Sequence, residues 1–270
     1  MEKTKRIKVI LKTLLGIFAA GMVITGGMLL YYGYGYWSDR KANDAVKEVA
    51  YDSASDADLL EDADSEDKSI DFAALSEIDP EIIGWVTACT GAIDGPIVQT
   101  DNNDYYLSHL FDNTTGNAGC FFVDTYSVPA FDCPFTVVYG HYKKDKSMFY
   151  SLHYYKDQDY YEENPTFTIY TENGSKVYQI FSVFYGDYEA DFEDIYEYGI
   201  TSDDADVDKI KNIYEQAVSR SLYDIGGTTA GADIADNLDQ MTDADIAVLY
   251  TCEYSGVNNR MLVFGINFSN

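Results

Sequence analysis

A long uncharged stretch near the N-terminus divides this chain into parts that must fold in different surroundings. Residues 13–38 contain no charged side chain, and as a helix they would reach about 39 Å at ~1.5 Å per residue, which exceeds the ~30 Å of a bilayer core. Basic residues precede the stretch, and Trp37 and several tyrosines gather at its far end, as interfacial aromatics do. We therefore expect a cytoplasmic segment at 1–12, a single-pass transmembrane anchor at 13–38 and the remainder in the extracellular space. A cleaved signal peptide is the alternative, although its apolar region usually has only about 7–15 residues.

The segment after the anchor, residues 39–69, is polar, acidic and poor in aromatics. It predicts a solvated stalk or a fraying helix. Its aspartates lack the glycine and the bidentate glutamate of an EF-hand loop, so they do not predict a calcium site. The formal net charge of −28 excludes nucleic acid as a partner, because phosphate binding needs a basic surface.

Residues 70–270 are expected to form a mainly β domain. Short runs rich in β-branched and aromatic residues, separated by turn residues, predict strands, and Asn173-Gly174 predicts a hairpin with a type I′ turn. We expect the strands at residues 95–100, 119–124, 135–140, 167–170, 177–184, 246–252 and 260–268. This pattern indicates a closed, mostly antiparallel barrel.

Helices are expected at the margins of the barrel. Phe72, Leu75 and Ile78 have the spacing of a short amphipathic helix, and Asp79-Pro80 has the form of an N-cap followed by proline at the first helical position. Apolar residues recur at helical spacing within 204–222, so a further helix is expected before the last two strands.

The last two predicted strands bring a thiol and a guanidinium together. Cys252 ends one strand, Arg260 begins the next, and seven residues connect them. Positions that flank the connection of an antiparallel pair lie opposite each other, so both residues are expected at one strand end. The other cysteines, Cys89, Cys120 and Cys133, are odd in number and do not indicate a disulfide framework, although one bridge among them stays open.

His141 is the candidate acid and base. It stands at the exit of a predicted strand, whereas His109 and His153 lie in predicted helix or loop and are expected to be surface or packing residues. A thiolate beside a cation is a reactive nucleophile, an imidazole can protonate a leaving amine, and an arginine can stabilise an oxyanion. No metal-binding pattern occurs, and no cofactor is expected. Without further information, Cys252 could equally be a buried apolar residue and Arg260 a surface residue, with no catalytic role.

Several motifs together resemble the class B sortases of Gram-positive bacteria. YGHYKKDKSMFYSL (139–152) is similar to their histidine motif, and YTCEYSGVNNRMLVFG (250–265) to their Thr-Cys motif with a downstream arginine. GWVTACTGAIDGPIVQ and PIVQTDNNDYYLSHLF are similar to the family's first strands. The resemblance covers residues 70–268. It implies a sortase-type closed β-barrel of about eight strands with N-terminal helices and a helix before the cysteine strand.

The resemblance also implies a membrane-anchored cysteine transpeptidase. Cys252 would attack a backbone carbonyl in an Asn/Ser-Pro-x-Thr sorting signal near the C-terminus of a secreted protein, and a peptidoglycan-precursor amine would resolve the thioacyl enzyme. His141 matches the family's general acid/base and Arg260 its oxyanion-stabilising arginine. The residues that the resemblance places against the substrate are Asn103, Tyr250, Thr251 and Glu253.

Two positions depart from the family's motifs. Tyr250 stands where serine is common, and Tyr142 stands where asparagine is common. The bulk of Tyr250 would reshape the pocket for the sorting signal, or else its ring would pack as a core aromatic on the inner face of the barrel. Other functions for the same chain are a pilin-polymerising sortase, a hydrolytic cysteine peptidase and a non-catalytic surface adhesion module.

Overall fold

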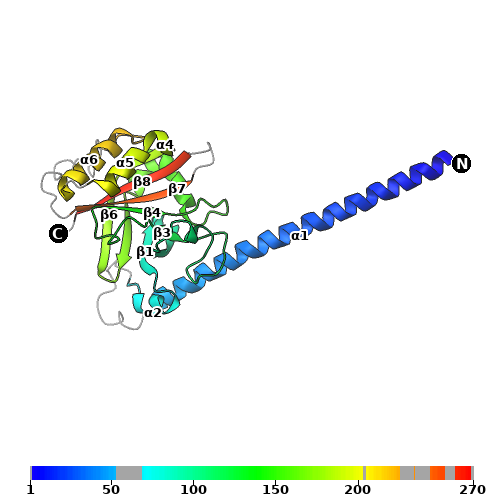
Figure 1. Cartoon of the computed structure of the whole chain (residues 1–270), viewed down its shortest axis with the longest axis horizontal. Coiled ribbons are helices and arrows are strands. Elements are labelled where there is room, and N and C mark those ends of the chain that lie inside the picture. The colour runs from blue at the N-terminus through cyan, green and yellow to red at the C-terminus, as the bar shows by residue number, and fades with distance from the viewer. Residues whose placement is uncertain are drawn as a thin grey trace.

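A closed barrel of eight strands forms the body of the protein, and one long helix projects from it (Figure 1). The structure, a computed structural model, describes residues 2–52, 69–202, 205–225, 234, 244–252 and 259–268. The strands are β1 (Ile82–Ala88), β2 (Ile93–Val98), β3 (Phe121–Val123), β4 (Phe135–Tyr139), β5 (Thr166–Thr171), β6 (Gly174–Asp187), β7 (Ala244–Cys252) and β8 (Asn259–Phe268).

The barrel closes in the order β1-β2-β3-β4-β7-β8-β6-β5. The pairs β2–β3 and β4–β7 are parallel, and the other neighbouring pairs are antiparallel. The predicted closed barrel is therefore confirmed, with a mixed sheet. The parallel β4–β7 pair is the feature that matters most for the site, because it joins the strand before His141 to the strand that contains Cys252.

Helices cover the outside of the barrel. They are α1 (Glu2–Asp52), α2 (Phe72–Ile78), α3 (Gln158–Glu163), α4 (Tyr188–Asp191), α5 (Glu193–Thr201) and α6 (Asp206–Ser219), with short 3₁₀ helices η3 (Cys89–Gly91), η4 (Tyr105–Leu107) and η5 (Phe149–Lys156). The predicted helices at 72–78 and 204–222 correspond to α2 and α6. The helix predicted to start at Asp79-Pro80 is wrong: the Asp79 N–H bonds to Leu75 O and ends α2, and its carboxylate accepts from Glu81 N just before β1.

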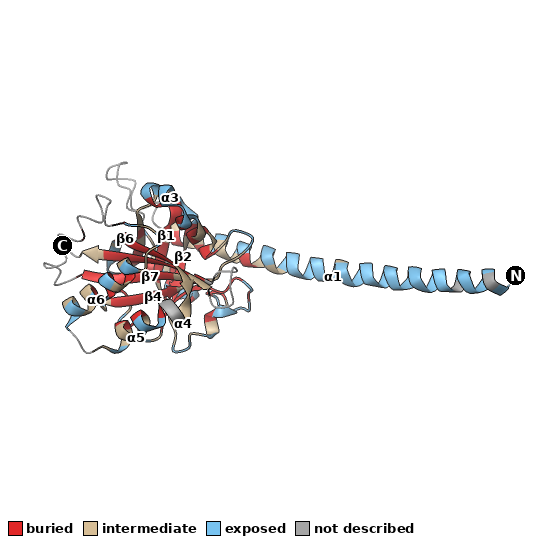
Figure 2. Cartoon of the chain, turned by 90° about the horizontal axis from the view of Figure 1, so that it is seen from above, coloured by how far each residue is buried: buried red, intermediate tan, exposed pale blue. Residues whose placement is uncertain are grey.

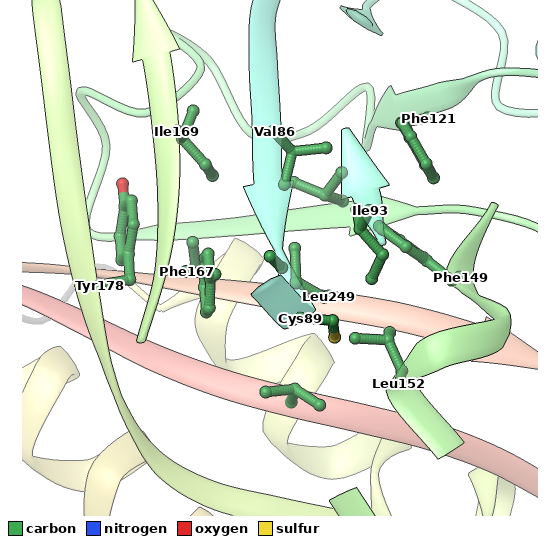
Figure 3. Close-up of a cluster of buried hydrophobic side chains, with 14 of the residues drawn as sticks. Val86, Cys89, Ile93, Phe121, Phe149, Leu152, Phe167, Ile169, Tyr178 and Leu249 are labelled. Atoms are coloured by element: carbon green, nitrogen blue, oxygen red, sulfur yellow. The ribbon is translucent and has the colours of Figure 1, made fainter. Parts of the chain in front are cut away.

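Successive side chains of a strand point alternately into the barrel interior and toward an outer layer. Both faces of the strands are buried, because apolar side chains fill the interior and helices cover the outside. On β7, Ala247 and Leu249 belong to the interior cluster shown in Figure 3, whereas Ile246 and Val248 pack under the helices of the outer layer. A second outer cluster, which includes Trp85, lies beneath α2 and the end of α1. The barrel thus has a core inside and a core on each of two outer sides.

Helix α1 is exposed over most of its length and docks on the barrel only at its C-terminal end (Figure 2). Val46 and Ala50 are completely buried there, and the Asp39 carboxylate accepts a hydrogen bond from Ala118 N. Residues 39–52 of the expected stalk, for which a solvated segment or a fraying helix was predicted, are therefore helical and pack on the barrel along one side. Residues 53–68 of the expected stalk lie outside the described residues. The helix is long and apolar enough to cross a membrane, as a signal sequence near the N-terminus would also be.

The predicted hairpin at 167–184 is present as β5 and β6. Its turn differs from the type I′ turn predicted on Asn173-Gly174. Thr171 pairs with Gly174, so Glu172 and Asn173 form the two-residue connection. Neither has a positive φ, whereas Gly174 has a φ of +128°. The turn prediction is wrong because Gly174 already belongs to the strand.

Candidate active site

The site is built on the ends of two parallel strands. Tyr139 on β4 pairs with Tyr250 on β7, and the N–H of Gly140 donates to the carbonyl oxygen of Tyr250 over 3.1 Å. His141 and Cys252 both stand two positions beyond this pair, so they occupy corresponding backbone positions at one edge of the barrel. The cysteine and histidine come from distant parts of the sequence, and the ladder of backbone hydrogen bonds aligns them.

The antiparallel β7–β8 pair adds the arginine. Cys252 is directly opposite Arg260, the last pair of this ladder before the connection. The expected register of the last two strands is therefore confirmed. The backbone thus places Cys252 between the strand that ends near His141 and the strand that starts near Arg260.

The period-two alternation of the strands assigns positions 141, 252 and 260 to the outer face of the barrel. Tyr139, Tyr250 and Leu262 each lie in the outer cluster beneath α5 and α6, and the residues two positions from them along the strands are His141, Cys252 and Arg260. The alternative that Tyr250 packs on the inner face of the barrel is wrong. The edge of the outer face is the side that a peptide can approach, because the interior is filled by apolar side chains.

His141 is half-buried and held in one orientation. Its Nε2 lies 2.7 Å from the carbonyl oxygen of Leu107. Since a carbonyl oxygen only accepts, Nε2 carries a proton, and Nδ1, which has no hydrogen bond to a described residue, is the nitrogen left for proton transfer. Gly119 backs the ring: its φ is +60°, and a Cβ there would lie 3.1 Å from His141 Cδ2 and 2.5 Å from Tyr106 O.

Arg260 is half-buried, and its charge is not neutralised within the described part of the chain. Its Nε donates to the Tyr250 hydroxyl over 2.8 Å, and its Nη1 donates to the Asn259 carbonyl oxygen over 3.0 Å. No described carboxylate forms an ion pair with it, and Nη2 has no hydrogen bond to a described residue. The guanidinium is therefore able to bind a developing negative charge.

The remaining predicted site residues have different surroundings. Asn103 uses both ends of its amide inside the protein, donating to Asp124 Oδ2 over 3.1 Å and accepting from Thr125 N over 3.0 Å. Thr251 is only 1% exposed, and its hydroxyl has no hydrogen-bond partner among the residues that the structure describes. Glu253 lies outside the described residues. The substrate contacts expected of these residues and of Tyr250 stay predictions.

An aromatic group beside the site was not found from the sequence. The ring of Tyr250 contacts the rings of Tyr139, Phe192 and Tyr188, with centroids 4.9, 5.8 and 6.1 Å away. Tyr188 and Phe192 belong to the α4–α5 segment that follows β6. The sequence offered no periodic signal for them, because α4 has only four residues.

A buried carboxylate anchors this aromatic group. Asp124 is fully buried, and its Oδ2 accepts hydrogen bonds from Tyr139 and Tyr196 over 2.8 and 2.9 Å as well as from Asn103. Its Oδ1 accepts from Tyr126 N. These bonds offset the cost of burying the charge and tie the loop after β3 to β4 and to α5.

A cavity of about 200 Å³ lies between α1 and the barrel, and Asp39, Arg40, Lys47 and Asp94 are among the residues that line it. Cys89, Cys120 and Cys133 are free thiols, so the single bridge left open among them is not formed.

Among the described residues, no cluster of side chains could hold a metal ion.

Comparison with known proteins shows which family this chain is similar to. No protein-family model matches the chain. A sortase B of Listeria monocytogenes is 38% identical over 106 residues, which cover 39% of this chain and 42% of that protein. The X-ray structure of Clostridium perfringens sortase B has a TM-score of 0.60 and 26% identity, covering 73% of this chain and 99% of that one. The chain is therefore similar to the class B sortases, in sequence over part of its length and in fold over most of it.

A third comparison extends the sortase fold over more of the chain. A Staphylococcus aureus sortase B–substrate complex has a TM-score of 0.65 at 18% identity and covers 85% of this chain and 96% of that one. The sequence match to the curated Listeria sortase spans less than half of that protein's length. The sortase-type barrel of this chain is thus shown by its similarity to solved structures.

Proposed function

We propose that this protein is a sortase-type cysteine transpeptidase with Cys252 as nucleophile, His141 as general acid/base and Arg260 as oxyanion-stabilising residue. The observation that supports it is the register of three neighbouring strands, which aligns Cys252 with His141 on one side and pairs it with Arg260 on the other. The substrate complex of the Staphylococcus aureus relative supports a sorting signal as the substrate class.

The proposed reaction has two halves. The Cys252 thiolate attacks the threonine carbonyl carbon of an Asn/Ser-Pro-x-Thr signal, and Arg260 stabilises the oxyanion that forms. His141 protonates the leaving amine as the peptide bond breaks, which gives a thioester on Cys252. An amine of a peptidoglycan precursor then attacks the thioester, its proton passes to His141, and the thiolate leaves.

We place the catalytic domain outside the cell, held to the membrane by α1. The apolar part of α1 is unburied, and the basic residues before it favour a cytoplasmic N-terminus. Protease treatment of intact cells tests this orientation. Residues beyond the anchor should be digested and residues 1–12 protected, and the reverse pattern would contradict the proposal.

Mass spectrometry of the detergent-solubilised full chain tests the chemistry. The protein is mixed with a small library of Asn/Ser-Pro-x-Thr peptides, with and without diaminopimelate as acceptor. We expect a thioacyl adduct on Cys252 and an amide product when the amine is present. The Cys252→Ala variant, the matched control, should form neither. Release of acid without any amide product would instead indicate the hydrolytic peptidase.

A further inference from the structure

The arginine of the proposed site donates a direct hydrogen bond to a side chain on the strand that contains the cysteine. Arg260 Nε donates to the Tyr250 hydroxyl over 2.8 Å, and the guanidinium carbon lies 5.9 Å from the centre of the same ring. Arg260 pairs with Cys252, two positions beyond Tyr250. Tyr250 and Arg260 are therefore diagonal neighbours across the β7–β8 ladder. Aromatic and long side chains can bridge this separation.

The tyrosine ring is itself fixed on several sides. Tyr139 meets it edge-on at an interplanar angle of 75°, and Phe192 and Tyr188 also contact it. Tyr139 in turn donates its hydroxyl to the buried Asp124 carboxylate. A ring packed in this way presents its hydroxyl at one place, whereas an unsupported arginine side chain samples many rotamers.

The position of the hydrogen bond determines which edge of the guanidinium stays available. Nε and Nη1 are both occupied within the protein, by Tyr250 and by the Asn259 carbonyl oxygen. The Nη2 group makes no hydrogen bond to any described residue. The guanidinium is thus preorganised to present Nη2 to a substrate oxygen, and preorganised donors are the ones that lower a reaction barrier.

We propose that Tyr250 is a positioning residue that orients Arg260 for oxyanion stabilisation, which rests on the function proposed above. It acts through Arg260 rather than on the substrate. The serine that often stands at this position in the family is too short to place a hydroxyl where the tyrosine hydroxyl lies. This chain therefore supports its arginine with a longer side chain backed by an aromatic group.

The test is Tyr250→Phe, which removes the hydroxyl and keeps the ring. Loss of a hydrogen bond to a charged group should lower kcat of transpeptidation about 10-fold, with little change in KM for the peptide, because the effect is on the transition state. The matched control is Tyr223→Phe, which removes a hydroxyl that donates to Tyr155 O. It should leave both kinetic constants unchanged.

A double-mutant cycle separates positioning from simple packing. Arg260→Ala should lower kcat about 100-fold to 1,000-fold, and adding Tyr250→Phe to it should cause no further loss if the tyrosine acts through the arginine. A full additional loss in the Arg260→Ala background would overturn the inference, as would wild-type kcat in Tyr250→Phe alone. A separate variant, Cys252→Ala, distinguishes the two proposals: if it stays active, the proposed function itself fails.

Discussion

The amide N–H of Gly140 donates to the carbonyl oxygen of Tyr250, and this bond is the last rung between β4 and β7 before His141 and Cys252. It fixes the register of two parallel strands at the point where the chemistry is proposed. A slip of one residue would move one of the two proposed catalytic residues to the opposite face of the sheet. The geometry of the site is therefore set mainly by backbone pairing.

Gly140 should not tolerate a side chain. An added Cβ would lie 2.5 Å from Phe149 Cδ2 and 2.8 Å from Phe121 Cδ1. We expect Gly140→Ala to lower the free energy of unfolding by about 1–3 kcal/mol through overpacking and to reduce kcat by displacing His141. Denaturant unfolding and peptide turnover measure the two effects. In Gly95→Ala the added Cβ would lie 3.1 Å from Phe121, so this variant should lower the free energy of unfolding less. Equal decreases in the two variants would contradict this explanation.

Thiol alkylation should distinguish the proposed nucleophile from the structural cysteines. Burial raises the pKa of Cys89 to about 11 and raises that of Cys120 as well, so both remain protonated and hidden in the folded protein at neutral pH. Cys252 pairs with Arg260 in the β7–β8 ladder, and under the proposed function this neighbouring cation would favour a thiolate. In a Cys133→Ala background, iodoacetamide at pH 7 should label Cys252 first. Labelling of Cys89 at the same rate in the folded protein would refute this.

The docked end of α1 should contribute measurably to stability. Val46 and Ala50 are completely buried against the barrel. We expect Val46→Ala to lower the free energy of unfolding by about 1–3 kcal/mol, because it leaves a cavity. Glu48→Ala, a change at an exposed position of the same helix turn, is the control and should have a small effect. Equal stabilities of the Val46→Ala and wild-type proteins would show that this packing is energetically unimportant.

The helices over the outer face should lose an ion pair in acid. Arg220 donates to both carboxylate oxygens of Asp194 over 2.7 Å, which lowers the pKa of Asp194 from its usual 3.8. Because the folded-state pKa is depressed, the stabilisation is present above pH 3.8 and disappears as the pH falls through the lowered value. Its size is at most about 1 kcal/mol, since the Asp194 side chain is 60% exposed.

The Asp194→Asn variant checks this pH dependence. The difference in unfolding free energy between the wild-type protein and Asp194→Asn should be largest near neutral pH and should shrink below pH 3.8. Urea unfolding at several pH values measures it. Glu215→Gln, at an exposed position on α6, is the control. A deficit that is constant down to the lowest pH would mean that the carboxylate charge is not the source of the effect.

The sequence was most informative where local patterns determine structure. The last two strands and α6 were predicted nearly to their ends, and the spacing of Cys252 and Arg260 predicted their pairing. β1 was missed by strand patterning because it is buried on both faces, which removes the alternation that marks a strand. The Asp79-Pro80 prediction failed because Asp79 can end one helix and stabilise a turn as readily as it can begin another helix.

Local sequence patterns could not predict the contacts in the site between residues that are far apart in the sequence. The contact of Tyr250 with Tyr188 and Phe192 depends on where a four-residue helix settles after β6. The role of Asp124 depends on tyrosines at positions 139 and 196 that meet only in the folded chain. Resemblance to a family supplied the roles of the reacting residues, but it could not supply these contacts, because Tyr250 departs from the family's motif.

The parallel pairing of β4 and β7 also affects how a chain like this can vary. The two strands are consecutive neighbours in the barrel, but β5, β6 and the helices α3 to α6 lie between them in the sequence. That intervening chain can lengthen or shorten at its surface connections without altering the spacing of the cysteine and the histidine. Evolution could therefore remodel the surroundings of the site while the backbone pairing that aligns residues 141 and 252 is inherited unchanged.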